Sequence, residues 1–216
     1  MKKFIKFLKY SFLFCFILGL LLAAGGAYWL YYQIVKVPAP EMTEANISAI
    51  LGRESPVYYS DGVTQFGVLF EDVHRQYVKY DEIPKHFIQA LIAAEDDQYF
   101  NHFGVDPMGI ARALLANYRA GRVVQGGSTL TQQTAKNLFK RESRSLKAKI
   151  KELMQAFRLE YYFSKEKILE FYCNQFYVSG NGHGLGVAAR YFFDKEPAEL
   201  TLVEAAFIAG CVKQPN

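Results

Sequence analysis

Residues 93–104 read AAEDDQYFNHFG, where an apolar helix is expected to end in a cluster of three acids. Pro84 suits the first position of that helix, because the N–H that proline lacks would have no partner there. Apolar residues at positions 88, 91 and 92 and then Glu95 follow the i, i+3, i+4, i+7 spacing of one helical face. Glu95 therefore continues a stripe that should otherwise be buried.

Glu95 also stands where an ionised carboxylate is disfavoured. It lies at the negative end of the predicted helix, with Asp96 and Asp97 directly after it. Each of these effects favours the protonated form, as a general base or acid working near neutral pH requires. The same pattern fits a capping cluster that faces water, so the local sequence leaves catalyst and cap both open.

The bulk composition excludes one class of function. The 216 residues leave room for one sizeable domain and an anchor, and the net charge is +4. Four lysines before residue 10 account for that charge, so the rest of the chain is close to neutral. A nucleic-acid binder spreads its basic residues over a domain face, so we expect no nucleic-acid partner.

Residues 11–32 contain no charged side chain, which is enough to cross a hydrocarbon core of about 30 Å as a helix. Lysines precede the stretch, and tyrosines and a tryptophan gather at its far end. We therefore expect a cytoplasmic basic tail (1–10), a transmembrane helix (11–32), a linker (33–55) and a catalytic domain (56–216) outside the cytoplasm. A signal peptide cleaved near residues 23–25 is the alternative, but the apolar run continues beyond that site.

The remaining pattern predicts a mainly α fold with a small β hairpin around residues 60–62. We expect helices at about 107–120, 129–139, 145–163, 165–174 and 205–211, and a mobile loop at 121–127. Cys173 and Cys211 are expected in the core, and the three cysteines form no disulfide framework. The core stripe of the long helix should be Leu146, Ile150, Leu153, Phe157 and Tyr161.

Residues 124–137, VQGGSTLTQQTAKN, form the second informative stretch. Two glycines allow close approach of the backbone to a ligand, and a Ser/Thr-rich helix N-terminus offers free N–H groups to an anion. Gln132, Gln133 and Lys136 lie within about one turn, so donors and a cation share a face. Taken alone, the stretch is also compatible with a well-capped polar helix that binds nothing.

Together these stretches resemble the peptidoglycan glycosyltransferases of glycosyltransferase family 51. The family motif E-D-x-x-F-x-x-H-x-G is matched by residues 95–104 with Tyr99 in the phenylalanine position, and G-G-S-T-[I/L]-T-Q-Q-x-x-K-N by residues 126–137. R-K-x-x-E appears at 148–152 with Ala148 replacing the arginine. K-x-x-I-L-E-x-Y-L-N appears at 165–174, and G-x-x-x-A-A-x-x-Y-F-G-K at 184–195 with Asp194 replacing the glycine.

The resemblance implies a lysozyme-like helical domain that polymerises lipid II onto a growing lipid-linked glycan chain. Glu95 would be the general base that deprotonates the acceptor 4-hydroxyl, and undecaprenyl pyrophosphate would leave with inversion. Such a displacement needs a base on one side and charge stabilisation on the other. The implied setting is the bacterial inner membrane, crossed once, with the domain on the periplasmic side and with cell-wall synthesis proteins as partners.

The resemblance also implies roles for other residues. Glu152 would be the second essential carboxylate, although the helical wheel alone reads it as a solvated acid. A divalent cation, Mg²⁺ or Mn²⁺, is implied with Glu95, Glu152 or Asp96 as candidate ligands, and no organic cofactor. The implied substrate-binding residues are Asp96, His102, Arg112, Ser128, Thr129, Gln132, Gln133, Lys136, Asn137, Arg144 and Lys149.

Two departures from the family pattern have different expected consequences. Ala148 removes a cation, for which Lys147 or Lys151 could substitute. Asp194 is expected to change a helix end and not the chemistry.

A transpeptidase is not encoded in these residues, although two short patterns imitate one. Ser164-x-x-Lys167 and the S-G-N at 179–181 lie only about 15 residues apart and no K-T-G follows, so Ser164 is better explained as a helix N-cap. The abrupt end at residue 216 is consistent with a longer parent protein.

Two other functions remain as alternatives to the polymerase. A lysozyme-like glycan-cleaving enzyme also uses a catalytic glutamate in a helical domain, but it has no pyrophosphate to hold. An inactive cell-wall assembly scaffold is disfavoured by the presence of both Glu95 and Glu152.

Overall fold

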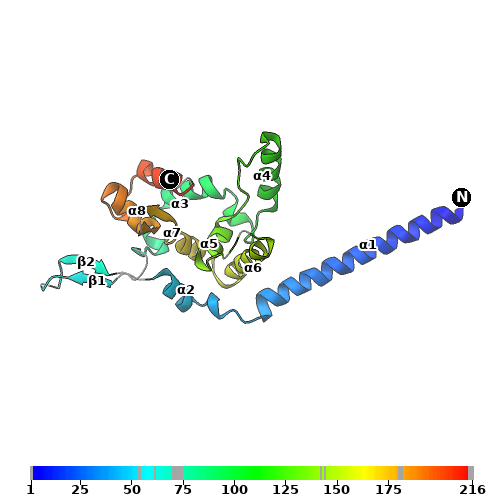
Figure 1. Cartoon of the computed structure of the whole chain (residues 1–216), viewed down its shortest axis with the longest axis horizontal. Coiled ribbons are helices and arrows are strands. Elements are labelled where there is room, and N and C mark those ends of the chain that lie inside the picture. Colours follow the sequence, from blue (N-terminus) through cyan, green and yellow to red (C-terminus); the bar gives the residue numbers. More distant parts are fainter. Residues whose placement is uncertain are drawn as a thin grey trace. The chain divides into compact units, whose positions relative to one another are not determined.

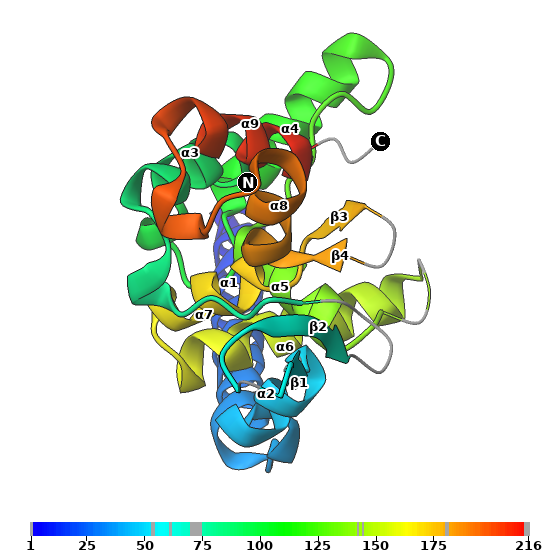
Figure 2. The same cartoon turned by 90° about the vertical axis from the view of Figure 1, so that its left-hand side faces the viewer.

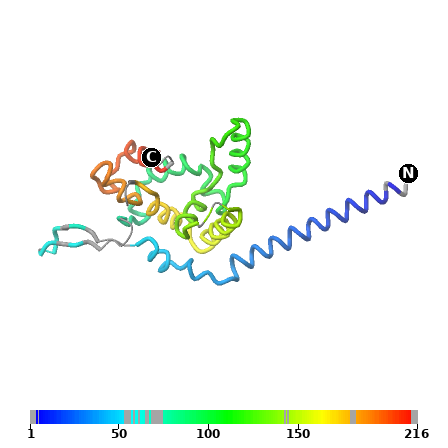
Figure 3. Tube along the Cα trace, viewed as in Figure 1, coloured from blue at the N-terminus to red at the C-terminus, as the bar shows by residue number. Residues whose placement is uncertain are grey.

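The computed structural model describes residues 2–52, 55–60, 62–69, 75–141, 143, 145–179 and 182–213. The chain divides into two compact units, Met1–Ala39 and Pro40–Asn216. In the first unit, α1 (Lys2–Tyr31) passes into a π-helical turn at Tyr32–Lys36, and Figure 3 shows the long helix as one continuous coil. Lys6–Lys36 is long and apolar enough to cross a membrane by length and composition. The expected span 11–32 falls inside this segment, and crossing the membrane stays a prediction.

The second unit begins earlier than the sequence indicated. Residues 33–55 were expected to form a linker, but α2 (Glu44–Leu51) lies within them, capped by the Thr43 side chain. Ile47 and Leu51 are fully buried, and α2 contacts α5 (Leu130–Leu138). The linker prediction is therefore wrong from Pro40 onward, because a helix of eight residues with two buried positions gives too short a pattern to recognise.

Two small antiparallel hairpins accompany the helices. β1 (Ser55–Tyr58) pairs with β2 (Gln65–Leu69), with Ser55 opposite Leu69, which confirms the predicted hairpin. The sequence did not predict the second hairpin, β3 (Tyr177–Ser179) with β4 (Gly182–His183). Residues 180 and 181, which belong to the transpeptidase-like pattern, lie outside the described residues.

The rest of the unit is helical, which confirms the mainly α fold. Besides α2 and α5 it contains α3 (Lys85–Glu95), α4 (Pro107–Ala120), α6 (Leu146–Tyr162), α7 (Lys165–Cys173), α8 (Gly184–Phe193) and α9 (Leu202–Lys213), with 3₁₀ turns at Pro40–Met42, Tyr80–Glu82, Tyr99–Asn101 and Pro197–Glu199. Within this unit α5 packs against both α6 and α7, and α3 packs against α9 (Figures 1 and 2).

Most helix ends follow their local signals. Ser164 caps α7 as expected, and Ser145 caps α6; each accepts a backbone N–H through its hydroxyl. Gly121 ends α4 in the left-handed conformation with φ 64°. Two helix starts differ from those expected: α5 begins at Leu130, capped by Thr129, and α9 begins at Leu202 and not near residue 205. Cys173 is buried as expected, whereas Cys211 is half-buried.

The predicted core stripe of α6 is wrong. Leu146 is 85% exposed and Ile150 58% exposed, whereas the buried positions of α6 are Glu152, Ala156 and Leu159. The buried face of α6 has a small residue, Ala156, because the chain at Gly104 packs closely against it. A Cβ placed on Gly104 would lie 3.4 Å from the Ala156 carbonyl oxygen. The polar positions are accepted there because Glu152 is paired with cations.

Asp194 occupies the left-handed C-cap of α8, with φ 54°. Glycine adopts this conformation without a Cβ penalty, so we expect Asp194→Gly to raise the free energy of unfolding by about 0.5–1 kcal/mol. Asp194→Ala, which keeps the Cβ, should give no gain. Urea unfolding of the two variants in detergent measures the difference, and an equal effect of both would contradict the explanation.

Candidate active site

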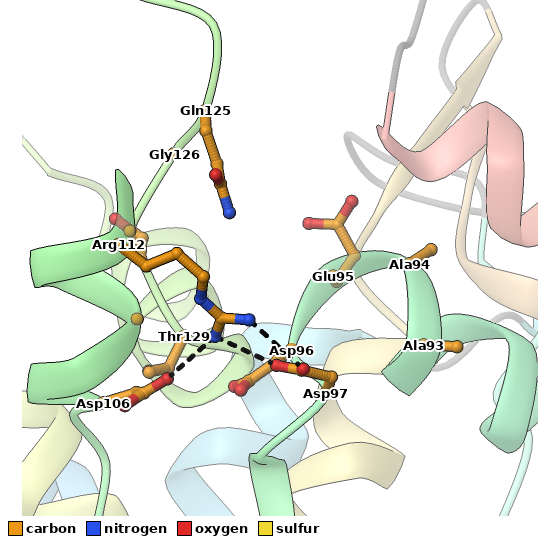
Figure 4. Close-up of a pocket in the computed structure, with 13 residues that line it drawn as sticks. Ala93, Ala94, Glu95, Asp96, Asp97, Asp106, Arg112, Gln125, Gly126 and Thr129 are labelled. Atoms are coloured by element: carbon orange, nitrogen blue, oxygen red, sulfur yellow. Dashed lines mark hydrogen bonds and ion pairs between the residues drawn. The ribbon is translucent and has the colours of Figure 1, made fainter. Parts of the chain in front are cut away.

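Glu95 is the last residue of α3, as the sequence predicted, and its carboxylate is held from one side. Its Oε2 accepts a hydrogen bond from Gln133 Nε2 at 2.8 Å. Its Oε1 is buried and has no hydrogen-bond partner in the described part of the chain. Figure 4 shows the carboxylate directed away from Asp96 and Asp97 and toward Gln125. One oxygen is thus fixed and the other is left for a ligand.

The orientation of the Gln133 amide is set by α7. Tyr172 Oη donates to Gln133 Oε1 at 3.4 Å, which leaves the amide nitrogen facing Glu95. Burial raises the pKa of Tyr172, and the negative charge of Glu95 raises it further. The hydroxyl therefore remains a donor at any physiological pH.

Asp96 faces the protein interior and braces the site. Both carboxylate oxygens lie 3.1 Å from His102 Nε2, and Oδ2 accepts the Leu130 N–H at 2.9 Å. These contacts join the end of α3 to the first turn of α5. Asp96 and His102 therefore hold the elements that carry the site. Asp96 also lines a cavity beside Glu95, and direct contact of either residue with a ligand stays a prediction.

Thr129 and Gln132 belong to the same support. Thr129 Oγ1 donates to the Gly104 carbonyl at 2.7 Å and accepts the Gln132 N–H at 3.2 Å. Gln132 returns its side chain to the Thr129 N–H, which completes a capping box. Both residues are buried, so this half of the glycine-containing motif builds the start of α5.

Arg112 of α4 lines a cavity together with Glu95. Its guanidinium nitrogens are 3.4 Å from the two Asp97 oxygens and 3.7 Å from Asp106 Oδ2 (Figure 4). The hydrogen bond to Asp97 and its negative charge raise the pKa of Arg112. Arg112 thus ties α4 to the residues directly after Glu95.

Two adjoining cavities, of about 220 and 620 Å³, are both lined by Glu95. Residues 125, 126 and 128 line both, Arg112 lines the smaller and Gln133 the larger. Gly127 is required by packing, because a Cβ there would lie 3.1 Å from the Ile110 Cα. Gly126 has open space around the same position, so its backbone remains accessible to a ligand.

The loop before these glycines was predicted to be mobile, but α4 holds it. Asn117 Oδ1 accepts the N–H groups of Val124 and Gln125 at 2.7 and 2.9 Å, and Asn117 Nδ2 donates to the Gln125 carbonyl at 2.9 Å. The Asn117 side chain therefore fixes the part of the loop that lines the Glu95 cavities.

Removal of this contact should weaken substrate binding more than chemistry. We expect Asn117→Ala to raise KM roughly fivefold with kcat little changed, as a loss of about 1 kcal/mol of loop ordering would. Asn117→Asp keeps the acceptor for both N–H groups and should have a smaller effect. Steady-state kinetics with the lipid-linked substrate that the resemblance implies measures both, and an unchanged KM in Asn117→Ala would contradict the assignment.

Glu152 is 3% exposed, so the solvated-acid interpretation from periodicity is wrong. Its Oε1 contacts Lys149 Nζ, and its Oε2 accepts from Arg141 Nη1 at 3.2 Å. Lys149 Nζ also donates to Ser128 Oγ at 3.3 Å, and Ser128 lines both Glu95 cavities. A chain of polar contacts thus runs from Glu152 through Lys149 to the mouth of the Glu95 site.

A third cavity, of about 560 Å³, opens beside Glu152 between the end of α5 and the start of α6. It is rich in cations, since its lining includes Lys136, Lys140, Arg141, Lys147 and Lys151. Asn137 is exposed on α5, and Arg144 lies outside the described residues. Sequence reasoning missed Arg141, which belongs to none of the motifs, and no spacing signal could have selected it.

The three candidate metal ligands do not converge. Among the described residues there is no group of three or more His, Cys, Asp or Glu side chains that could hold a metal ion. The oxygens of Asp96 and Glu152 are engaged by His102, the Leu130 N–H and two cations, and Glu95 Oε1 alone of the set remains open. These residues therefore do not fit a resident cation site of their own.

Fold and site together define a class: a helical domain in which a half-buried carboxylate lines two adjoining cavities and cations lie nearby, an arrangement suited to displacing an anionic leaving group. The chain belongs to the transglycosylase family, because the family model described as Transglycosylase matches residues 61–216.

Named relatives agree with this family. Penicillin-binding protein 1A of Aquifex aeolicus is 40% identical over 205 residues, covering 92% of this chain and 27% of that protein. Penicillin-binding protein 1A of Vibrio cholerae is 39% identical over 216 residues (99% and 25%), and that of Escherichia coli 39% over 215 residues (98% and 24%). The chain thus spans about a quarter of the length of these relatives.

Proposed function

We propose that this chain is a membrane-anchored peptidoglycan glycosyltransferase that polymerises lipid II into β-1,4 glycan strands and releases undecaprenyl pyrophosphate. The observation that carries the proposal is the state of the Glu95 carboxylate. One oxygen accepts a hydrogen bond from Gln133, and the other is buried beside a cavity with no hydrogen-bond partner among the described residues. A carboxylate in this position can accept a proton from a bound hydroxyl, which is the task of a general base.

In the proposed reaction, Glu95 takes the proton of the acceptor sugar's 4-hydroxyl. The hydroxyl oxygen attacks the anomeric carbon of the donor, and the bond from that carbon to the pyrophosphate oxygen breaks with inversion. The pyrophosphate leaves with its charge, which positively charged side chains stabilise as it develops. Lys149 and Arg112, which flank the Glu95 cavities, and Lys136, beside Glu152, are the described cations suited to this role.

The membrane part of the proposal rests on α1. A retained anchor at Lys6–Lys36, with the lysine-rich start in the cytoplasm, would keep the domain on the periplasmic side of the bacterial inner membrane. A lipid-linked substrate and a growing lipid-linked glycan would then be confined to the same surface as the enzyme. Other cell-wall synthesis proteins are proposed as partners.

A divalent cation, Mg²⁺ or Mn²⁺, is proposed to arrive with the substrate. Magnesium is usually bound through phosphate oxygens and one or two carboxylates, so a pyrophosphate substrate brings most of the ligands itself. When bound, the cation would neutralise phosphate charge, and the protein residues would do the positioning and proton transfer.

The two alternative functions meet specific obstacles. A glycan-cleaving enzyme would have no use for the cationic cavity beside Glu152. Burying a carboxylate oxygen without a hydrogen-bond partner costs free energy, and Glu95 Oε1 is buried in this way among the described residues. An inactive scaffold would gain nothing from this arrangement.

One experiment separates the three functions. The purified chain is incubated in detergent with labelled lipid II and Mg²⁺, and separately with preformed glycan strands. Conversion of lipid II into a ladder of longer strands supports the polymerase. Shortening of preformed strands supports the cleaving enzyme, and no change in either supports the scaffold.

A further inference from the structure

The two oxygens of Glu152 are held by cations from different elements. Oε1 contacts Lys149, three residues earlier on α6, and Oε2 accepts from Arg141 in the segment between α5 and α6. Glu152 is 3% exposed, so both cations meet it where water competes little.

Arg141 is itself held by hydrogen bonds from both its side chain and its backbone. Its Nε donates to the Ser143 carbonyl at 2.6 Å, and its backbone N–H donates to the Lys136 carbonyl at 3.3 Å. Its side chain is 23% exposed. The guanidinium therefore reaches Glu152 from a residue that is itself held by hydrogen bonds, and not as a free surface cation.

Position 148 explains why a loop residue is needed. It precedes Glu152 by four residues on α6, so a long cation there would reach the carboxylate by the i, i+4 relation. The motif that this stretch resembles has arginine at that position, but this chain has Ala148, which lines the cavity beside Glu152. Because position 148 is alanine, α6 provides no cation at this position to pair with Glu152.

We propose that Arg141 is a positioning residue that holds Glu152 in place of the arginine missing at position 148. The inference rests on the proposed function only for its effect on activity, because the ion pair itself can be tested by stability. Arg141 ties the end of α5 to α6, and it balances the buried charge of Glu152 so that Lys149 can also serve Ser128. Lys147 and Lys151, the substitutes expected from sequence, line the cavity together with Arg141, and Arg141 contacts the Glu152 carboxylate.

The test moves the cation from the loop to the helix. Arg141→Ala should lower kcat for lipid II polymerisation about tenfold or more with a small change in KM, since one partner of a buried carboxylate is lost. Arg141→Ala combined with Ala148→Arg should recover activity to within about threefold of the unmodified chain. Arg141→Lys should fall between these, because lysine keeps the charge but not the planar pair of donors. Arg122→Ala, an exposed arginine in the loop after α4, is the control.

Thermal unfolding of the same variants is measured alongside the kinetics. Arg141→Ala should unfold at a lower temperature, and adding Ala148→Arg should restore the midpoint. If Arg141→Ala is as active as the unmodified chain, or if Ala148→Arg rescues neither kcat nor the midpoint, the proposal is wrong. If the unmodified chain does not polymerise lipid II, the proposed function fails, and the midpoints alone still decide whether Arg141 holds Glu152.

Discussion

Glu95→Gln should abolish lipid II polymerisation while the domain remains folded, with a loss on the order of 10²–10⁴-fold, the usual contribution of a general base. Glutamine has nearly the shape of glutamate, and its carbonyl oxygen can still accept the Gln133 amide hydrogen that Glu95 Oε2 accepts at 2.8 Å. What disappears is the oxygen able to take a proton, because an amide is not a base at neutral pH. The substitution therefore separates chemistry from architecture.

The measurement is the rate of strand formation from labelled lipid II, together with thermal unfolding and substrate binding of the same preparation. Glu166→Gln, which neutralises an exposed acid in the first turn of α7, is the matched control and should keep full activity. Binding of lipid II should persist in Glu95→Gln, because the cations are untouched. A folded Glu95→Gln variant that still forms strands would rule out Glu95 as the base.

The sequence predicted features that depend on neighbouring residues. The end of α3 at Glu95, the bounds of α4 and the Ser164 cap of α7 are all set by neighbouring residues and were predicted. The capped start of α5 was also recognisable from its Ser/Thr- and Gln-rich sequence, whereas ligand binding there stays a prediction. Glu152 was found only through the resemblance, because its burial depends on cations that the helical wheel does not show.

The features that were missed depend on contacts between distant segments. Periodicity assigned Leu146 and Ile150 to the core, yet both are exposed, because the inner face of α6 is shaped by close packing and ion pairs. The Asn117 contact to residues 124 and 125, and the Tyr172 contact that orients Gln133, join elements that no short pattern relates. Arg141 was invisible for the same reason.

Glu152→Ala should lower both the free energy of unfolding and the activity. Glu152→Gln should lower mainly the activity, so the two variants separate these effects. Truncation leaves Lys149 and Arg141 facing each other across an empty site with side chains 33% and 23% exposed. Removing one partner of a buried ion pair is strongly destabilising, and partial solvation of these cations should reduce the cost to about 2–3 kcal/mol. Glutamine fills the space and accepts one hydrogen bond, so it should recover most of that stability.

Activity should not recover in Glu152→Gln to the same extent. With the negative charge gone, Lys149 is no longer balanced beside Glu152 and can shift from Ser128, which lines the Glu95 cavities. We expect kcat to fall on the order of 10²-fold, as when one group that stabilises developing charge is displaced. Urea unfolding and polymerisation kinetics of both variants measure the two effects. If Glu152→Gln is fully active, Glu152 serves only packing, whereas equal losses of stability in both variants would mean that charge and not shape holds α6 against the α5–α6 loop.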